Sequence, residues 1–225
     1  LLDGRDLLCI LPTGAGKSLC WQLPALMMDG LTIVISPLIV LMHDQVRHLR
    51  ERGIPSVHLD SLMTPAERAD ALNQLTRGQA KIAFLAPERL NHPEIHALCQ
   101  QHPPAMVVVD EAHCVVQWGD AFRPSYQQIG QFVASLPRRP VLCAMTATAD
   151  KQLQRGIVQS LGLRHPKRIV MPVERPNLHY SVLPTAHVTD AILRALQKIP
   201  GKAVVFCRLR ARTESLAERL NRAGI

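Results

Sequence analysis

Residues 11–18 have the types and spacing of a phosphate-binding loop and read Leu-Pro-Thr-Gly-Ala-Gly-Lys-Ser. Gly14 and Gly16 allow the backbone to turn its N–H groups toward an anion, and the N-terminus of a following helix adds a partial positive charge. Lys17 would contact the terminal phosphates, and the Ser18 hydroxyl would hold a magnesium ion. The predicted nucleotide-binding residues are Pro12, Thr13, Gly14, Ala15, Gly16, Lys17, Ser18 and Leu19.

The sequence on both sides of this loop supports the interpretation. Residues 7–10 are apolar, as in a buried strand, and residues 18–28 are typical of a helix, which is the context that the loop requires. Leu11 stands where the strict motif has glycine, so a polar surface turn is the alternative.

Two acids, Asp110 and Glu111, directly follow the apolar residues 106–109. The end of an apolar strand is where a fold with a phosphate-binding loop places its magnesium carboxylate and its water-orienting base. Asp110 would hold the ion, directly or through its waters, and Glu111 would polarise the attacking water. An ordinary turn is the alternative. We predict that Lys17, Asp110 and Glu111 are catalytic, and that the magnesium ligands are Ser18 and Asp110.

Short apolar runs alternate with longer amphipathic segments along the chain. The expected strands are residues 6–11, 31–36, 56–59, 82–86, 106–109, 141–145, 169–171 and 203–207. The best-marked helix is 64–77, where Thr64 and Glu67 form a capping box, Pro65 opens the first turn and Gly78 follows the last. Apolar residues at helical spacing predict another helix over 38–52. This alternation predicts an α/β fold, a parallel sheet covered by helices on both faces.

Composition excludes several classes of protein. With 225 residues, 47% of them hydrophobic, the chain can bury a sizeable core. We expect no signal peptide and no membrane span, since residues 1–6 lack a cationic segment and the apolar residues 31–42 are short and interrupted. The six cysteines include no Cys-x-x-Cys pair, which predicts reduced thiols and a cytoplasmic or nucleoid-associated protein. The ten histidines are scattered, and we assign no metal cluster to them.

Charge is distributed unevenly along the chain. Residues 1–136 carry 10 Lys and Arg against 13 Asp and Glu, a net charge of −3, whereas residues 137–225 carry 16 against 5, a net charge of +11. A basic half beside a nearly neutral one favours a polyanionic partner, nucleic acid first. A solvated basic surface is the alternative.

Residues 110–126 read Asp-Glu-Ala-His-Cys-Val-Val-Gln-Trp-Gly-Asp-Ala-Phe-Arg-Pro-Ser-Tyr. This run resembles the signature of the RecQ family of DNA helicases, in superfamily 2. Residues 11–24 resemble the family's first motif, whose usual form also lacks the glycine at the position of Leu11. Further stretches resemble motif Ia at 36–39 and 44–46, motif Ib at 86–90, motif III at 144–150, the inter-lobe segment at 175–178 and motif IV at 204–207.

The resemblance implies two RecA-like motor lobes. Residues 1–172 would be the first, ATP-binding lobe, residues 173–185 the connection, and residues 186–225 the N-terminal part of the second lobe. The implied cofactors are ATP and Mg²⁺, and the implied partner is single-stranded or forked DNA, which the protein would unwind in the 3′ to 5′ direction. Because the family has an upstream glutamine segment and later motifs with an arginine finger, we expect a fragment that hydrolyses ATP slowly on its own.

Residues in several motifs are expected to couple DNA binding to hydrolysis: His113, Gln117, Trp118, Phe122, Arg123, Thr146 and Thr148. An aromatic loop that also includes Tyr126 could contact bases, although Trp118 and Phe122 could instead be core residues. Thr148 could also cap the helix expected at 149–161. The family usually has His at Asp120 and an acid at Ala121. The departure at Asp120 keeps open an ATPase switch that binds nucleic acid without unwinding it. An RNA helicase with an Asp-Glu-Ala-His box is the other alternative, although the loop at 117–126 resembles the DNA-directed family.

Overall fold

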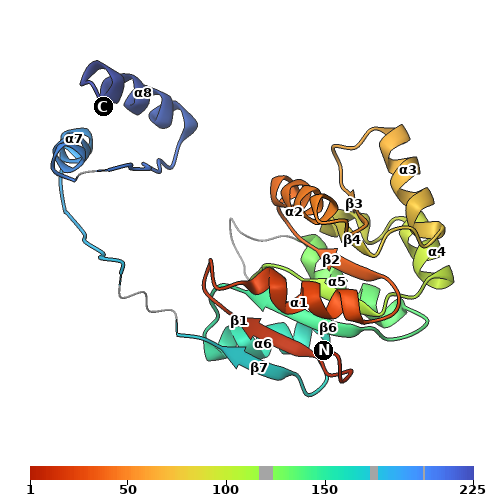
Figure 1. The fold of residues 1–225 in the computed structure, drawn as a ribbon. Helices are drawn as coiled ribbons and strands as arrows, with labels where there is room; N and C mark the ends of the chain where they lie inside the picture. The colour runs from red at the N-terminus through yellow and green to blue at the C-terminus, as the bar shows by residue number, and fades with distance from the viewer. Residues whose placement is uncertain (117–123, 173–176, 200) are drawn as a thin grey trace. The chain divides into compact units, whose positions relative to one another are not determined.

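The computed structural model describes residues 1–116, 124–172, 177–199 and 201–225 (Figure 1). The chain divides into two compact units, Leu1–Glu174 and Arg175–Ile225. Each unit is described by itself below. No helix in the described parts of the chain is long and apolar enough to cross a membrane.

The first unit is built on a seven-stranded sheet in the order β3-β4-β2-β5-β6-β1-β7, with every strand pair parallel. The strands are β1 (Leu7–Ile10), β2 (Thr32–Ile35), β3 (Ser56–Leu59), β4 (Ile82–Leu85), β5 (Met106–Val109), β6 (Val141–Thr146) and β7 (Lys167–Val170). The α/β fold class predicted from the alternation is therefore confirmed. Six strands match their expected ranges within one residue at each end, and β7 begins two residues before its expected range and ends one residue before it.

Helices cover both faces of this sheet (Figure 1). On one face, α1 (Lys17–Met27) and α2 (Ile39–Glu51) pack on a core cluster that includes Cys9, Val108 and Cys143. On the other face, the helices pack on the neighbouring, oppositely directed strand residues, such as Leu8 and Val107. These helices are α3 (Pro65–Thr76), α4 (Pro93–Gln101), α5 (Pro124–Ser135) and α6 (Lys151–Leu161). Strand residues are buried on both faces, which explains the continuous apolar runs in the sequence.

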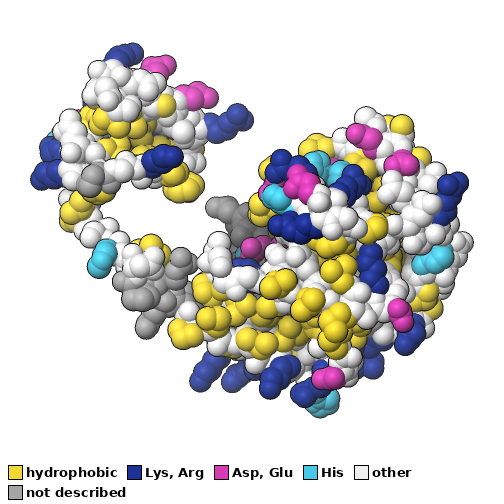
Figure 2. All heavy atoms as spheres, in the orientation of Figure 1, with side chains coloured by type: hydrophobic (Ala, Val, Ile, Leu, Met, Phe, Trp, Pro, Cys, Tyr) yellow, Lys and Arg dark blue, Asp and Glu magenta, His cyan; other side chains and the backbone are white. Residues whose placement is uncertain are grey.

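The outer surface of α1 is apolar. Leu19, Leu23 and Met27 recur at helical spacing and are exposed. Figure 2 shows apolar side chains spread over this helix and the sheet edge beside it.

The ends of two helices test predictions made from sequence. The Thr64 side chain accepts a hydrogen bond from the Glu67 N–H, and the Glu67 carboxylate accepts one from the Thr64 N–H, so the capping box of α3 is confirmed. The suggestion that Thr148 caps the helix after β6 is wrong. Asp150 is the cap of α6, accepting a hydrogen bond of 2.7 Å from the Leu153 N–H. A carboxylate serves this position well because it also faces the positive end of the helix dipole.

A buried ion pair joins the start of β1 to the loops before β6 and after α6. Asp6 is 2% exposed and accepts hydrogen bonds from the Arg139 guanidinium at 2.6 and 3.1 Å. The Leu142 and Arg164 N–H groups donate to the same carboxylate at 3.0 and 2.6 Å. Burial alone would raise the pKa of Asp6, but these donors outweigh it and lower the pKa. The four hydrogen bonds anchor the strand that leads into the phosphate-binding loop.

The second unit contains two helices, α7 (Val188–Lys198) and α8 (Arg210–Arg222). The strand expected at 203–207 is absent among the described residues, which are extended there without a strand partner. The prediction fails because a parallel strand needs a neighbouring strand for its hydrogen bonds, and the described residues of this unit supply none. Val204 and Phe206 are consequently exposed.

Candidate nucleotide site

Three strands bring the predicted chemistry to one edge of the sheet. The loop 11–18 follows β1, the acids Asp110 and Glu111 follow β5, and Thr146 ends β6, which lies between them in the sheet. The Leu11 N–H donates to the Thr146 carbonyl at 3.2 Å, which fixes the start of the loop against β6. Carboxyl ends of parallel strands are the usual ligand sites of open α/β sheets.

The loop 11–18 has a backbone shape that requires glycine. Gly14 and Gly16 have φ angles of 84° and 82°, and no atom lies within 4 Å of a side-chain carbon built on either. Backbone conformation rather than crowding therefore excludes other residues. Gly16 is the N-cap of α1 and has no side chain to occupy the first N–H groups of the helix. These groups and the helix dipole fit an anion.

Lys17 folds back over this loop. Its Nζ donates to the Leu11 carbonyl at 3.0 Å, so the ammonium group lies across the loop from its own helix. The loop that carries Lys17 follows β1, and Asp110 and Glu111 follow β5, so the cation and the acids lie at the same edge of the sheet with only β6 between their strands. The positive charge of Lys17 favours the ionised form of both acids, although burial still raises the pKa of Asp110. The loop cation and the strand-end carboxylates therefore belong to one site.

Asp110 is largely buried at the end of β5. Its N–H donates to the Ile35 carbonyl at 2.9 Å, and its Oδ1 accepts from the Glu111 N–H at 3.0 Å. Burial, followed by the negative charge of Glu111, raises the pKa of Asp110 despite the opposing effects of Lys17 and a hydrogen bond from Ser36. A carboxylate whose charge is this poorly compensated fits a cation, because a bound dication would lower its pKa.

Glu111 occupies a left-handed backbone conformation, with φ 47° and ψ 46°. This conformation is uncommon for a residue with a side chain and costs on the order of 1–3 kcal/mol. The 3-10 turn η2 (Ala112–Val115) begins directly after it. The turn places His113 so that its Nδ1 lies 3.2 Å from the Glu111 Oε2.

His113 connects the acids to β6. Its Nδ1 also lies 3.0 Å from the Thr146 Oγ1, and the Thr146 hydroxyl donates to the Thr148 carbonyl at 3.2 Å. Contacts with the Cys114 thiol and the Glu111 carboxylate raise the pKa of His113 to about 10. The hydrogen bond from His113 lowers the pKa of Glu111. Imidazolium and carboxylate therefore coexist at neutral pH.

A family model described as DEAD/DEAH box helicase matches residues 1–155. The chain belongs to the DEAD/DEAH box helicase family. The residues Asp110, Glu111, Ala112 and His113 spell the DEAH box of that description.

Individual relatives of this DEAD/DEAH box helicase chain are named as RecQ proteins. It is 38% identical over 225 residues to the ATP-dependent DNA helicase RecQ of Haemophilus influenzae, covering all of this chain and 36% of that protein. It is 40% identical over 233 residues to the RecQ of Synechocystis, covering 49% of that protein. The resemblance to RecQ helicases is confirmed, and the chain spans about a third to a half of the length of these relatives.

Solved helicase structures share the fold of this DEAD/DEAH box helicase chain. The DUF1998 helicase MrfA has a TM-score of 0.69 and 24% identity, covering 98% of this chain and 36% of that one. A hypothetical ATP-dependent RNA helicase from Sulfolobus tokodaii has a TM-score of 0.60 and 18% identity, covering 97% of this chain and 64% of that one. Both likenesses support the RecA-like assignment of the sheet.

The structure brings together five of the residues predicted from sequence: Lys17, Asp110, Glu111, His113 and Thr146. Thr148 joins them only through its main-chain carbonyl. Gln117, Trp118, Phe122 and Arg123 lie outside the described residues, as do Asp120 and Ala121.

Tyr126 corrects part of the aromatic-loop hypothesis. It is 0% exposed, and its hydroxyl donates to the Asp110 carbonyl at 3.1 Å, so this ring cannot stack on a base. Sequence analysis placed Ser36 in motif Ia but gave it no role at this site, where its side chain lowers the pKa of Asp110. Its position after β2, the strand beside β5, was the available signal.

Proposed function

We propose that this chain contains the ATP-binding motor lobe of a DNA helicase that acts in the 3′ to 5′ direction. The observation that carries the proposal is the placement of the loop with Lys17 after β1 and of Asp110 and Glu111 after β5, at the same edge of the sheet. DNA is proposed as the polymer because the RecQ relatives are named as DNA helicases. These relatives match the whole chain at 38–40% identity.

The loop 11–18 is proposed to bind the phosphates of ATP. Gly14 and Gly16 turn the backbone, the open N-terminus of α1 faces the anion, and Lys17 exchanges the Leu11 carbonyl for a phosphate oxygen. Pro12, Thr13, Ala15, Ser18 and Leu19 complete the loop and the first turn of the helix.

The Ser18 hydroxyl and the Asp110 carboxylate are proposed to hold Mg²⁺. The position of Asp110 at the end of β5, directly beside the second acid Glu111, supports a dication there. Such an ion neutralises charge that develops on the transferring phosphoryl group. The hydrogen bond that the Asp110 carboxylate accepts from the Glu111 N–H fixes its orientation. Ser36, which follows β2, lowers the pKa of the same carboxylate.

Glu111 is proposed to accept a proton from the attacking water. Its lowered pKa keeps the carboxylate ionised, and His113 holds it from one side at 3.2 Å. A positioned general base of this type contributes about 10²- to 10⁴-fold to a rate. His113 acts as a positioning residue, because it contacts Glu111 rather than the substrate.

DNA binding is proposed to reach this site through His113, Thr146 and the loop that carries Gln117, Trp118, Phe122 and Arg123. The His113 Nδ1 lies 3.2 Å from the Glu111 Oε2 and 3.0 Å from the Thr146 Oγ1, which provides a route from β6 to the base. The basic charge of residues 137–225 supports contact with a polyanion.

We place the first lobe at residues 1–172, the connection at 173–185 and the start of the second lobe at 186–225. The division of the structure between Glu174 and Arg175 supports this arrangement.

A strand-displacement assay on the full-length protein tests the proposed function. A duplex with a 3′ single-stranded tail should be unwound in the presence of Mg-ATP, and a duplex with only a 5′ tail should not. Hydrolysis stimulated by DNA without displacement would instead indicate an ATPase switch. Stimulation by RNA and not by DNA would indicate an RNA helicase.

A further inference from the structure

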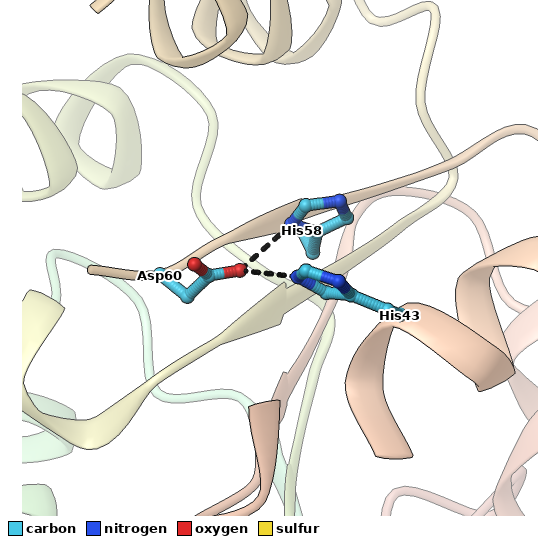
Figure 3. Close-up of side chains that lie close together, drawn as sticks. All are labelled: His43, His58 and Asp60. Carbon is cyan, nitrogen blue, oxygen red and sulfur yellow. Dashed lines mark hydrogen bonds and ion pairs between the residues drawn. The ribbon is translucent and has the colours of Figure 1, made fainter. Parts of the chain in front are cut away.

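The side chains of His43, His58 and Asp60 form a cluster at the opposite edge of the sheet from β1 (Figure 3). His43 lies on α2, His58 on the edge strand β3, and Asp60 directly follows that strand. β3 is separated from β5, which carries Asp110, by two strands. The cluster is therefore distinct from the proposed nucleotide site.

Both imidazoles point at the same carboxylate oxygen. The His43 Nε2 lies 2.8 Å and the His58 Nδ1 2.9 Å from the Asp60 Oδ2, and the two rings stack with centroids 4.1 Å apart. The other oxygen, Oδ1, accepts the Leu62 N–H at 2.8 Å. The main chain thus holds the carboxylate with one oxygen turned toward two nitrogen donors.

This arrangement is close to that of a metal site. The three ligand atoms lie within 4.8 Å of one another. Ligands about 2.0–2.2 Å from a tetrahedral Zn²⁺ are about 3.3 Å apart. Side-chain movements of about half an ångström would open the cluster to that spacing. Two imidazoles and one carboxylate suit zinc, cobalt, nickel or copper, whereas Mg²⁺ prefers oxygen ligands.

We propose that His43, His58 and Asp60 bind a divalent transition-metal ion of the zinc class. His43 would bind through Nε2, His58 through Nδ1 and Asp60 through Oδ2. In the metal-bound form each imidazole would carry its proton on the other ring nitrogen and donate the freed lone pair to the metal. Three protein ligands leave a fourth position for water, on the side where the His43 side chain is 43% exposed.

The protonation states favour this ligand set. Burial, followed by the charge of His43, lowers the pKa of His58, which keeps that imidazole neutral. Burial alone would raise the pKa of Asp60, but hydrogen bonds from His43, Leu62 and His58 outweigh it and lower the pKa. A neutral His58 ring beside an ionised Asp60 carboxylate suits a dication.

Two nearby arginines face main-chain oxygens rather than this carboxylate. Arg89 donates to the Asp60 carbonyl at 2.6 and 3.1 Å, and Arg50 donates to the Ser56 carbonyl at 2.7 Å. Their positive charges disfavour a dication, which predicts an affinity below that of a closed structural zinc site. Figure 2 shows histidine, acidic and basic side chains at the surface over α2, so an ion can approach from solvent.

Isothermal titration calorimetry with ZnCl₂ tests the proposal on the full-length protein without nucleotide. We expect one Zn²⁺ bound by the natural protein and by His48→Ala, a matched control that removes an exposed histidine from the same helix. His43→Ala and Asp60→Asn should weaken binding by at least the roughly 10- to 100-fold lost when an outer partner of a metal ligand is removed. Melting curves without metal verify that each variant folds.

The spectrum of the Co²⁺ form separates this site from the free thiols. Cys20 and Cys207 are partly exposed, and binding to them would give a sulfur-to-cobalt charge-transfer band. Visible cobalt bands without that charge transfer support the His and Asp ligands. The proposal is overturned by a thiolate band, by unchanged Zn²⁺ affinity in His43→Ala, by an equal loss in His48→Ala, or by the absence of binding.

Discussion

The Nδ1 of His113 lies 3.0 Å from the Thr146 Oγ1, and this contact joins the turn after β5 to the end of β6. The same nitrogen lies 3.2 Å from the Glu111 Oε2. A change at the end of β6 can therefore alter the position of the proposed base through one histidine. Thr146 is 0% exposed and the His113 side chain is 26% exposed, so the contact is partly shielded from water.

Removing the Thr146 hydroxyl should reduce DNA-stimulated hydrolysis. Thr146→Val keeps the volume but removes the acceptor for His113 and the donor to the Thr148 carbonyl. Loss of one hydrogen bond is worth about 1 kcal/mol, or roughly a fivefold to tenfold lower rate. Thr148→Val is the matched control and should have little effect, because Thr148 contributes only its carbonyl. Equal losses in both variants would exclude this route.

Glu111→Gln should separate binding from chemistry. The amide keeps the shape of the side chain but cannot accept a proton, so hydrolysis should fall by about 10²- to 10⁴-fold. The affinity for Mg-ATP, measured by calorimetry, should remain within a few-fold of the natural protein. Asp110→Asn should instead raise the Mg²⁺ concentration needed for half-maximal rate. A Glu111→Gln protein with normal turnover would show that another group activates the water.

The stabilisation that the Glu111–His113 pair gives to the folded protein should decrease as the pH rises. The pKa of His113 is raised to about 10 from an unfolded value near 6.5, so its stabilising contribution is fully present below pH 6.5 and is lost as the pH rises toward 10. Thermal melting from pH 6 to 10 should show a steeper decline in the natural protein than in His113→Gln. Parallel curves would count against a charged His113.

Among the buried acids of the first unit, Asp6 should be the one whose removal lowers the free energy of unfolding most. Asp6→Ala leaves the Arg139 charge and two N–H donors without their acceptor, which should lower the free energy of unfolding by about 3–5 kcal/mol. The exposed Asp3→Ala is the control and should change it by about 0.5 kcal/mol or less. Denaturant titration measures both.

The stability that Asp6 contributes should decrease in acid. Because the folded pKa of Asp6 is lowered, its contribution is present above its unfolded value of about 3.8 and is lost as the pH falls through the folded pKa. The difference between natural protein and Asp6→Ala should therefore shrink in acid. A constant difference down to pH 2 would contradict the ionised pair.

The sequence predicted most accurately those features that depend on residues close together along the chain. The buried strands, the capping box at Thr64 and the loop–helix start at Gly16 and Lys17 each arise within a few residues, so local patterns were sufficient. The choice of Asp150 over Thr148 as a cap depends on where α6 begins, and helix boundaries are the least certain part of such predictions.

Contacts between distant residues were not predictable in this way. Asp6 and Arg139 are 133 positions apart, and His43 and Asp60 are 17 apart on different elements. The scattered histidines gave no metal pattern, because the cluster forms only when α2 packs beside β3. The expected strand at 203–207 had the right composition, but a strand also needs a partner, which its own residues cannot supply.

The rate of ATP hydrolysis by the full-length protein and its Lys17→Ala variant, with and without single-stranded DNA, tests the central claim most directly. Lys17 is the cation that links the loop to Asp110 and Glu111, so its loss should lower the DNA-stimulated rate by at least about 100-fold. Melting curves should show that the variant remains folded, because Lys17 is only partly buried. A folded Lys17→Ala protein that retains DNA-stimulated hydrolysis at the natural rate would contradict the proposed site.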